Sequence, residues 1–133
     1  DDFEPIEGAE AWQLSNPPIL SMAAIRASLD IFDEAGFENL RKKSVQLTNY
    51  LEALLLQLPT NRIKIITPTH TSERGCQLSI AVKDADKTLF DQLTQKGVVA
   101  DWREPDVIRV APVPLYNRFE DCYRFVELLK NLL

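Results

Sequence analysis

The sequence is short of the residues on which many catalytic and binding sites depend. Its 133 residues include four glycines, one histidine and two cysteines. With so few glycines it has no G-x-G-x-x-G or P-loop motif for nucleotide phosphates, and no G-x-S-x-G elbow for a nucleophilic serine. A single imidazole, His70, and the lack of C-x-x-C spacing argue against a Cys/His metal site. Because His70 lies in a turn rich in Thr and Ser, we interpret it as a surface histidine.

Long apolar runs and an excess of positive charge are also missing. The richest apolar stretch, residues 51–58, is interrupted by Glu52 and Gln57 and is far shorter than the roughly 20 residues of a membrane span. The net charge is −5 and the pI is about 4.9. A nucleic-acid-binding protein normally presents a basic face to the phosphates. We therefore expect neither a membrane nor a nucleic-acid partner.

From the start of the sequence we expect no signal peptide. It opens Asp1-Asp2-Phe3-Glu4, with no basic segment and no apolar segment of a signal peptide. It also lacks an initiator Met, so we expect the start to be a domain boundary. The two cysteines, Cys76 and Cys122, are typical of free thiols in a reducing cytoplasm, although one disulfide between them stays open as an alternative.

What is present is an ordinary globular composition, with 45% hydrophobic and 26% charged residues. We expect an extended linking arm over residues 1–17 and a small domain over 18–133. The segment Ser15-Asn16-Pro17-Pro18 predicts the start of a helix, with Ser15 or Asn16 as its N-cap. A helix is predicted from Pro18 to about Glu34, a break at Gly36, and a second helix to near Pro59. On that second helix, the basic residues 41–43 are interpreted as a solvated face.

Shorter elements follow. Alternating apolar residues predict strands, and apolar residues at helical spacing predict two more helices. Asp84 or Asp86 is expected to cap the first of these helices and Gly97 to stop it, and Asn117 with Glu120 resembles a capping box for the last. The order is helix, helix, strand, strand, helix, strand, strand, helix, which predicts an α+β fold with a small, mostly antiparallel sheet covered by helices. The predicted strands are 63–66, 77–82, 98–100 and 107–110, and the first helix after the second strand spans 87–96.

Two residues are candidates for binding an anion. Arg109 lies between Ile108 and Val110 in a predicted strand, where its guanidinium must leave the apolar face or find an anion. A carboxylate held by two hydrogen bonds suits this group, and solvent exposure or a local Asp or Glu partner is the alternative. Asn16 stands at a predicted helix start, where N–H groups favour anions such as phosphate, and an ordinary N-cap is the alternative.

Several segments resemble kynureninases, in family order and with similar gaps. The strings ERGCQL and IRVAPVPLYN are the most specific of them. The resemblance spans nearly the whole chain and identifies it as similar to the C-terminal small domain of that family, whose members are fold-type I enzymes. The matching segments are 12–20, 65–68, 73–78, 97–101 and 108–117.

This resemblance implies a homodimeric enzyme that uses pyridoxal 5′-phosphate (PLP). The family hydrolyses L-kynurenine, or its 3-hydroxy form, to anthranilate or 3-hydroxyanthranilate and L-alanine. Mapped by motif, Arg109 would bind the substrate α-carboxylate, and Asn16 would contribute to the cofactor-phosphate region across the dimer interface. None of the seven lysines lies in the family's Schiff-base context, so the chain resembles a part of a longer enzyme. We expect it alone neither to bond PLP covalently nor to turn over kynurenine.

Two other classes of function stay open on the sequence. A free-standing α+β module could bind an amino acid through Arg109 or act as a regulatory domain, because fold alone does not decide function. A protein-interaction domain that dimerises through its helices is the third interpretation.

Overall fold

The computed structural model describes residues 4–133, which form two compact units, up to Phe37 and from Glu38 to Leu133. Each unit is described by itself. Residues 1–3 of the predicted linking arm lie outside the described residues. The boundary between the units falls at the start of the second helix, so the first helix is grouped with the arm.

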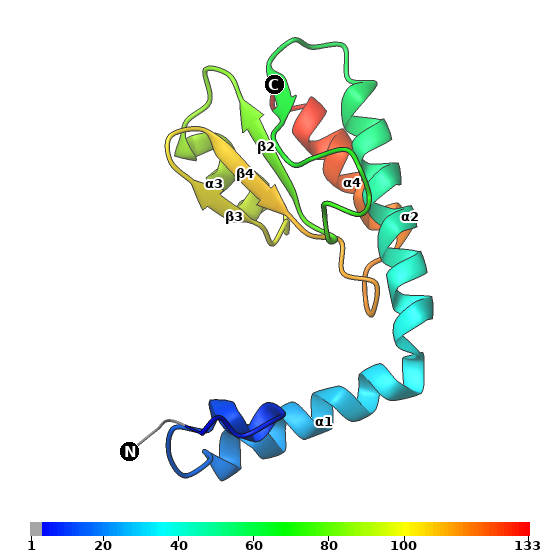
Figure 1. Ribbon diagram of the computed structural model, residues 1–133. Coiled ribbons are helices and arrows are strands. Elements are labelled where there is room, and N and C mark those ends of the chain that lie inside the picture. The colour runs from blue at the N-terminus through cyan, green and yellow to red at the C-terminus, as the bar shows by residue number, and fades with distance from the viewer. Residues whose placement is uncertain (1–3) are drawn as a thin grey trace. The chain divides into compact units, whose positions relative to one another are not determined.

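The first unit consists of a short 3₁₀ helix, η1 (Ala9–Trp12), and α1 (Ile19–Ala35), shown in blue in Figure 1. Pro18 is the N-cap of α1, and no side chain caps the helix. The predicted cap at Ser15 or Asn16 is therefore wrong, because both residues precede the two prolines and stand too far from the first free N–H groups. The predicted break is confirmed, since Gly36 ends α1 with φ 77°.

The apolar face of α1 is not buried. None of its residues is buried in the structure. The unit instead exposes large apolar side chains, most fully at Leu14, Trp12, Leu20 and Ile19.

The second unit is built on a four-stranded antiparallel sheet, as predicted. Its strand order is β1-β2-β4-β3, and these strands are β1 (Ile63–Ile65), β2 (Leu78–Val82), β3 (Asp101–Arg103) and β4 (Val107–Val110). Three strands match the prediction closely, but β3 begins where the predicted strand 98–100 ends. The Val98 N–H donates to the Leu93 carbonyl at 3.0 Å, so this segment closes the preceding helix and is not free to join the sheet.

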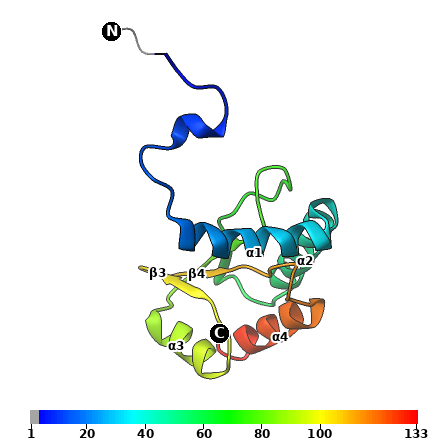
Figure 2. The ribbon, with the colours of Figure 1, turned by 90° about the horizontal axis from the view of Figure 1, so that it is seen from below.

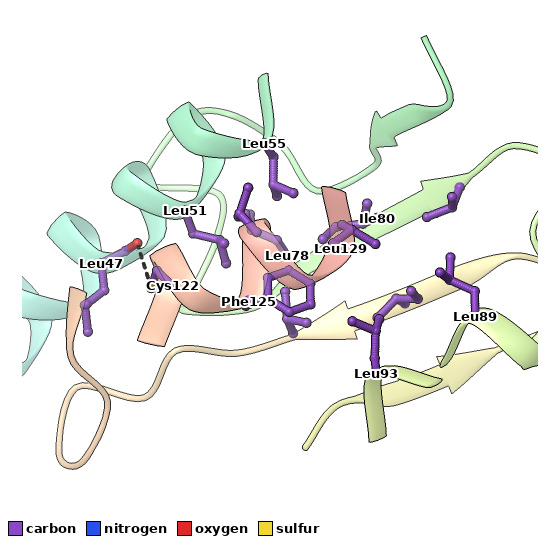
Figure 3. Packing of buried hydrophobic residues seen from close by; sticks show 14 residues of the cluster. Leu47, Leu51, Leu55, Leu78, Ile80, Leu89, Leu93, Cys122, Phe125 and Leu129 are labelled. Carbon is purple, nitrogen blue, oxygen red and sulfur yellow. Dashed lines mark hydrogen bonds between the residues drawn. The ribbon is translucent and has the colours of Figure 1, made fainter. Parts of the chain in front are cut away.

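Three helices cover one face of the sheet: α2 (Phe37–Leu56), α3 (Lys87–Gln95) and α4 (Phe119–Lys130). Figure 2 shows α3 and α4 on the same side of β3 and β4. Alternation along the strands turns Ile80, Ile108 and Val110 toward these helices, and all three are buried. Figure 3 shows how the core forms between the sheet and the helices, with Leu47, Leu51, Leu93, Phe125 and Leu129 among its members.

The helix ends of this unit follow the predicted chemistry with one exception. Asp86 accepts the Thr88 N–H at 2.8 Å as the N-cap of α3, and Gly97 follows that helix at φ 86°. At the start of α4, however, the Asp121 carboxylate accepts the N–H of the N-cap residue Arg118 at 2.8 Å. The predicted pair of Asn117 and Glu120 is wrong, because the Asn117 side chain instead accepts the Val113 N–H at 2.8 Å.

Candidate carboxylate-binding site

Arg109 lies in the middle of β4, on the sheet face opposite the core. Its neighbours Ile108 and Val110 point into the core, so alternation places Arg109 on the other face. On that face it stands directly between Ser79 of β2 and Asp101 of β3, its partners in the two ladders. All three helices of the unit pack on the core side, and the Arg109 side chain keeps 32% of its surface exposed.

The Arg109 guanidinium is held by Asp101. Arg109 Nε donates to Asp101 Oδ2 at 2.6 Å, and Nη2 donates to the same oxygen. Arg103 Nε donates to that oxygen as well, at 3.0 Å. The hydrogen bond from Arg109, ahead of the nearby charge of Arg103, lowers the pKa of the Asp101 carboxyl. Of the alternatives that the sequence left open, the structure thus shows a local Asp partner for Arg109 as well as partial exposure.

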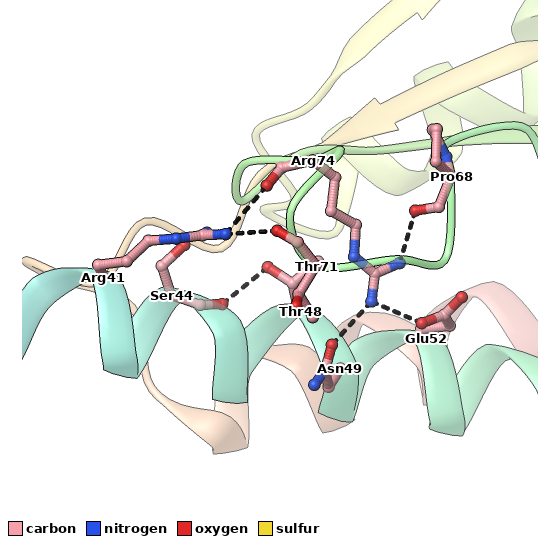
Figure 4. Close-up of polar contacts among 8 residues, drawn as sticks. All are labelled: Arg41, Ser44, Thr48, Asn49, Glu52, Pro68, Thr71 and Arg74. Atoms are coloured by element: carbon pink, nitrogen blue, oxygen red, sulfur yellow. Dashed lines mark hydrogen bonds and ion pairs between the residues drawn. The ribbon is translucent and has the colours of Figure 1, made fainter.

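The loop that leads into β2 is fixed to α2 by a buried polar cluster, which Figure 4 shows. Arg74 is 8% exposed and its Nη2 donates to Glu52 Oε2 at 2.6 Å and to Asn49 Oδ1 at 2.7 Å. Its Nη1 donates to the Pro68 carbonyl at 3.2 Å. Arg74 thus joins Pro68 of its own loop to α2, and the loop continues directly into the strand that carries Ser79.

The sequence prediction missed this cluster. Glu52 interrupts an apolar stretch, but it stands between Thr48 and Leu55 on the buried side of α2, where a carboxylate needs a partner. The position of Glu52 on the apolar side of the helix was the sequence feature that could have indicated a buried ion pair. The partner itself could not be found from spacing, because Arg74 lies 22 residues away in an irregular loop.

The basic residues of α2 are a second correction. Arg41 Nη2 donates to the carbonyls of Thr71 and Arg74, and Lys43 Nζ donates to the Pro114 carbonyl at 2.7 Å. Both are half-buried, and only Lys42 is exposed as the solvated face predicted. Lysine and arginine here serve as hydrogen-bond donors to loop carbonyls, which lie close to α2 only in the folded chain.

Other chemistry is sparse in the described part of the chain. His70 is exposed and its imidazole is hydrogen-bonded to Ser72, as expected for a surface histidine. Cys76 and Cys122 are both free thiols. Within residues 4–133 no group of three His, Cys, Asp or Glu side chains could hold a metal ion. Over the same residues, none of the helices combines the length and the apolar character needed to cross a membrane.

A cavity of about 540 Å³ lies on the core side of the sheet, apart from Arg109. Its wall includes Val110, Phe125 and Leu128, with Lys96 and Arg124 also lining it. Arg124 is paired with Glu120 of its own helix. The cavity thus contains neither of the predicted binding residues.

Asn16, the second candidate, belongs to the first unit. It is exposed in the bend before Pro17, and its side chain makes no hydrogen bond within residues 4–133. Its amide is therefore available to a ligand or to another part of a protein.

Comparison with solved structures places the fold among PLP enzymes of fold type I. A C-DES variant with glycine covalently linked to its PLP cofactor matches over 95% of this chain and 32% of its own, with TM-score 0.73 and 18% identity. A NifS-like protein matches over 96% of this chain and 38% of its own, with TM-score 0.71 and 19% identity. The predicted fold class, the C-terminal α+β domain of such enzymes, is confirmed.

The family follows from sequence comparison. The model of the kynureninase C-terminal domain matches residues 40–129, and the chain belongs to that family. Kynureninase of Koribacter versatilis is 56% identical over 126 residues, and that of Myxococcus xanthus is 51% identical over 129. The matches cover 95% and 97% of this chain but only 30% of either relative. The resemblance stated from the motifs is thereby confirmed, and the chain spans less than a third of the relatives' length.

Proposed function

We propose that this chain is the C-terminal domain of a kynureninase and that Arg109 binds the α-carboxylate of L-kynurenine or its 3-hydroxy form. The family match and the identity of 51–56% with kynureninases support the first part. The second part is supported by the partly exposed Arg109 side chain at the centre of a sheet face that no helix of its own unit covers. Hydrolysis to anthranilate, or its 3-hydroxy form, and L-alanine would be the activity of the whole enzyme.

Arg109 has the physical properties that an anchor for a carboxylate requires. Its backbone is fixed by ladders to strands on both sides, so the guanidinium starts from a rigid position. Arginine stays charged over the whole physiological pH range and binds a carboxylate with two parallel hydrogen bonds. Such binding orients the Cα substituents of an amino acid with respect to a reacting group elsewhere in the site.

The described residues do not fit a PLP site by themselves. Six of the seven lysines are exposed, and Lys43 is engaged with the Pro114 carbonyl. PLP supplies the electron sink for cleavage of the carbon–carbon bond, and in this proposal it is held by protein outside this chain. Asn16, with its free amide, would contribute to the region of the cofactor phosphate. Homodimerisation and a cytoplasmic location belong to the same proposal and are supported only by the resemblance and by the free thiols.

The proposal can be tested in a chimera in which this chain replaces the matching C-terminal part of Koribacter versatilis kynureninase. Formation of anthranilate from L-kynurenine is expected, because the chain is 56% identical to the part it replaces. Arg109→Lys is expected to reduce kcat/KM at least tenfold, since a lysine cannot form the two parallel hydrogen bonds. Arg124→Lys serves as the control, because Arg124 is exposed and paired within α4. Undiminished kcat/KM in Arg109→Lys would overturn the proposed role.

A further inference from the structure

We infer that Asp101 is a positioning residue for Arg109. Its carboxylate accepts hydrogen bonds from one edge of the Arg109 guanidinium and leaves the other edge free for the carboxylate of the substrate. This inference rests on the proposed function and adds to it a residue that orients the Arg109 guanidinium. It is drawn from the particular nitrogens that Asp101 engages.

A guanidinium has two edges at which a carboxylate can accept a pair of parallel hydrogen bonds. One edge is formed by Nε and Nη2, and the other by Nη1 and Nη2. Asp101 Oδ2 accepts from Nε, at 2.6 Å, and from Nη2. Nη1 makes no hydrogen bond within residues 4–133. Asp101 therefore occupies the first edge only, and the second edge is open to a ligand.

The pairing is built into the sheet. Asp101 and Arg109 are direct partners in the β3–β4 ladder, so their Cβ atoms project side by side from the same face. The ladder holds both side chains without any help from the ligand. A rotamer of Arg109 that would turn the open edge away from its present direction must break two charge-assisted hydrogen bonds.

The charged groups around Asp101 give the site a net positive charge, which favours binding of an anion. Asp101 alone would neutralise Arg109, but Arg103 also donates to Oδ2, at 3.0 Å. Two guanidinium groups and one carboxylate leave a net charge of about +1, which matches a substrate with one carboxylate. Arg103 is exposed, with 60% of its side-chain surface accessible, so its charge acts mainly to offset that of Asp101.

NMR of the 133-residue chain tests the hydrogen bonds between Arg109 and Asp101 directly. The Arg109 Nε–H signal is expected to be displaced from that of the exposed Arg124 and to exchange slowly with water. Addition of acetate, used as a probe of the open edge, is expected to shift the Nη signals of Arg109 and leave its Nε–H signal in place. Loss of the displaced signal on addition of acetate would contradict the inference, because it would mean that Asp101 and the ligand compete for one edge.

Kinetics of the chimera separate this inference from the proposed function. Asp101→Ala is expected to raise KM for L-kynurenine about tenfold with a smaller change in kcat, and Asp101→Asn, which keeps an acceptor oxygen, to restore part of the loss. Asp106→Asn in the same hairpin is the control for loss of an acidic charge. If Arg109→Gln reduces kcat/KM but both Asp101 variants behave like the parent, the positioning role is wrong and the proposed function stands. If Arg109→Gln has no effect, the proposed function itself fails.

Discussion

At the scale of single residues, the environment of a charged side chain depends on the partner that the fold places beside it. Arg109 could be recognised from the sequence because a guanidinium between β-branched residues needs either solvent or an anion. Its partner Asp101 could not be chosen, since the pairing depends on the register of β3 against β4. The predicted strand at 98–100 also ended one residue before Asp101. The same reasoning applies to Arg74, whose partner Glu52 is far away in the sequence.

The buried pair of Arg74 and Glu52 gives a stability prediction. Glu52→Gln is expected to lower the free energy of unfolding by about 3 kcal/mol, because it leaves a buried guanidinium without a compensating charge. Urea denaturation of the chain followed by circular dichroism measures this change.

Two controls make that measurement specific. Asp91→Asn removes an exposed partner of Lys87 and is expected to change the unfolding free energy by less than about 0.5 kcal/mol. The double variant Glu52→Leu with Arg74→Met removes both buried charges and is expected to be more stable than Glu52→Gln alone. A Glu52→Gln protein as stable as the parent would show that the ion pair does not fix loop 66–77.

Cys122 gives a prediction of pH dependence. Burial raises the pKa of its thiol from 9.0 to about 11. Between these values the unfolded chain loses the proton and the folded chain keeps it, so the free energy of unfolding falls as the pH rises from 9 to 11. Below pH 9 both states hold the proton and Cys122 adds no pH dependence.

The contribution of Cys122 can be isolated by comparing the chain with Cys122→Ala. The slope of unfolding free energy against pH from 9 to 11 is expected to be shallower in the variant. In the parent at neutral pH, a thiol reagent is expected to modify the half-buried Cys76 and to reach Cys122 only after unfolding. Equal labelling rates of the two cysteines in the folded chain would contradict the burial of Cys122.

At the scale of helices and strands, periodicity predicted which elements exist better than where they end. The leucines at 40, 47 and 51 follow one face of α2 and are all buried, as their spacing indicates. The end of α3 was also predictable, since Gly97 adopts the left-handed conformation that stops a helix. The start of β3 was not, because the apolar residues after Gly97 resemble a strand while their backbone folds back onto α3.

Gly97 yields a prediction at this scale. Gly97→Ala is expected to lower the free energy of unfolding by about 1 kcal/mol, because φ 86° is unfavourable for a residue with a Cβ atom. No atom would crowd the added methyl group, so the cost is one of backbone conformation alone. Gly75→Ala is the matched control, since Gly75 also has open space but no positive φ, and it is expected to be close to neutral or slightly stabilising. Equal stability of the two variants would contradict this explanation.

At the scale of the whole molecule, the chain spans less than a third of the length of the kynureninases that it matches. The apolar residues of α1 are exposed in the first unit. The motifs of the sequence predicted the fold class and the family, and helical periodicity predicted that α1 has an apolar face. Amphipathic spacing shows that a helix has an apolar face and does not show which molecule covers it.

The chain by itself is expected to be inactive. Six of its seven lysines are exposed and Lys43 donates to the Pro114 carbonyl, so no buried lysine is available to bond PLP. After incubation with PLP and desalting, the chain is expected to retain no stoichiometric absorbance of bound cofactor and to form no anthranilate from L-kynurenine. The chimera, treated identically, is the positive control. A yellow stoichiometric complex of the isolated chain would contradict the expectation.

The binding of a substrate carboxylate by Arg109 is tested most directly by a double-mutant cycle between that residue and the substrate. The chimera and its Arg109→Gln variant are each assayed with L-kynurenine and with its carboxamide, and kcat/KM is compared. With Arg109 present, we expect the acid to be preferred about a hundredfold, as for a charge-assisted pair of hydrogen bonds worth about 3 kcal/mol. In Arg109→Gln the preference is expected to fall to a few-fold. An unchanged preference in the variant would show that another group binds the carboxylate.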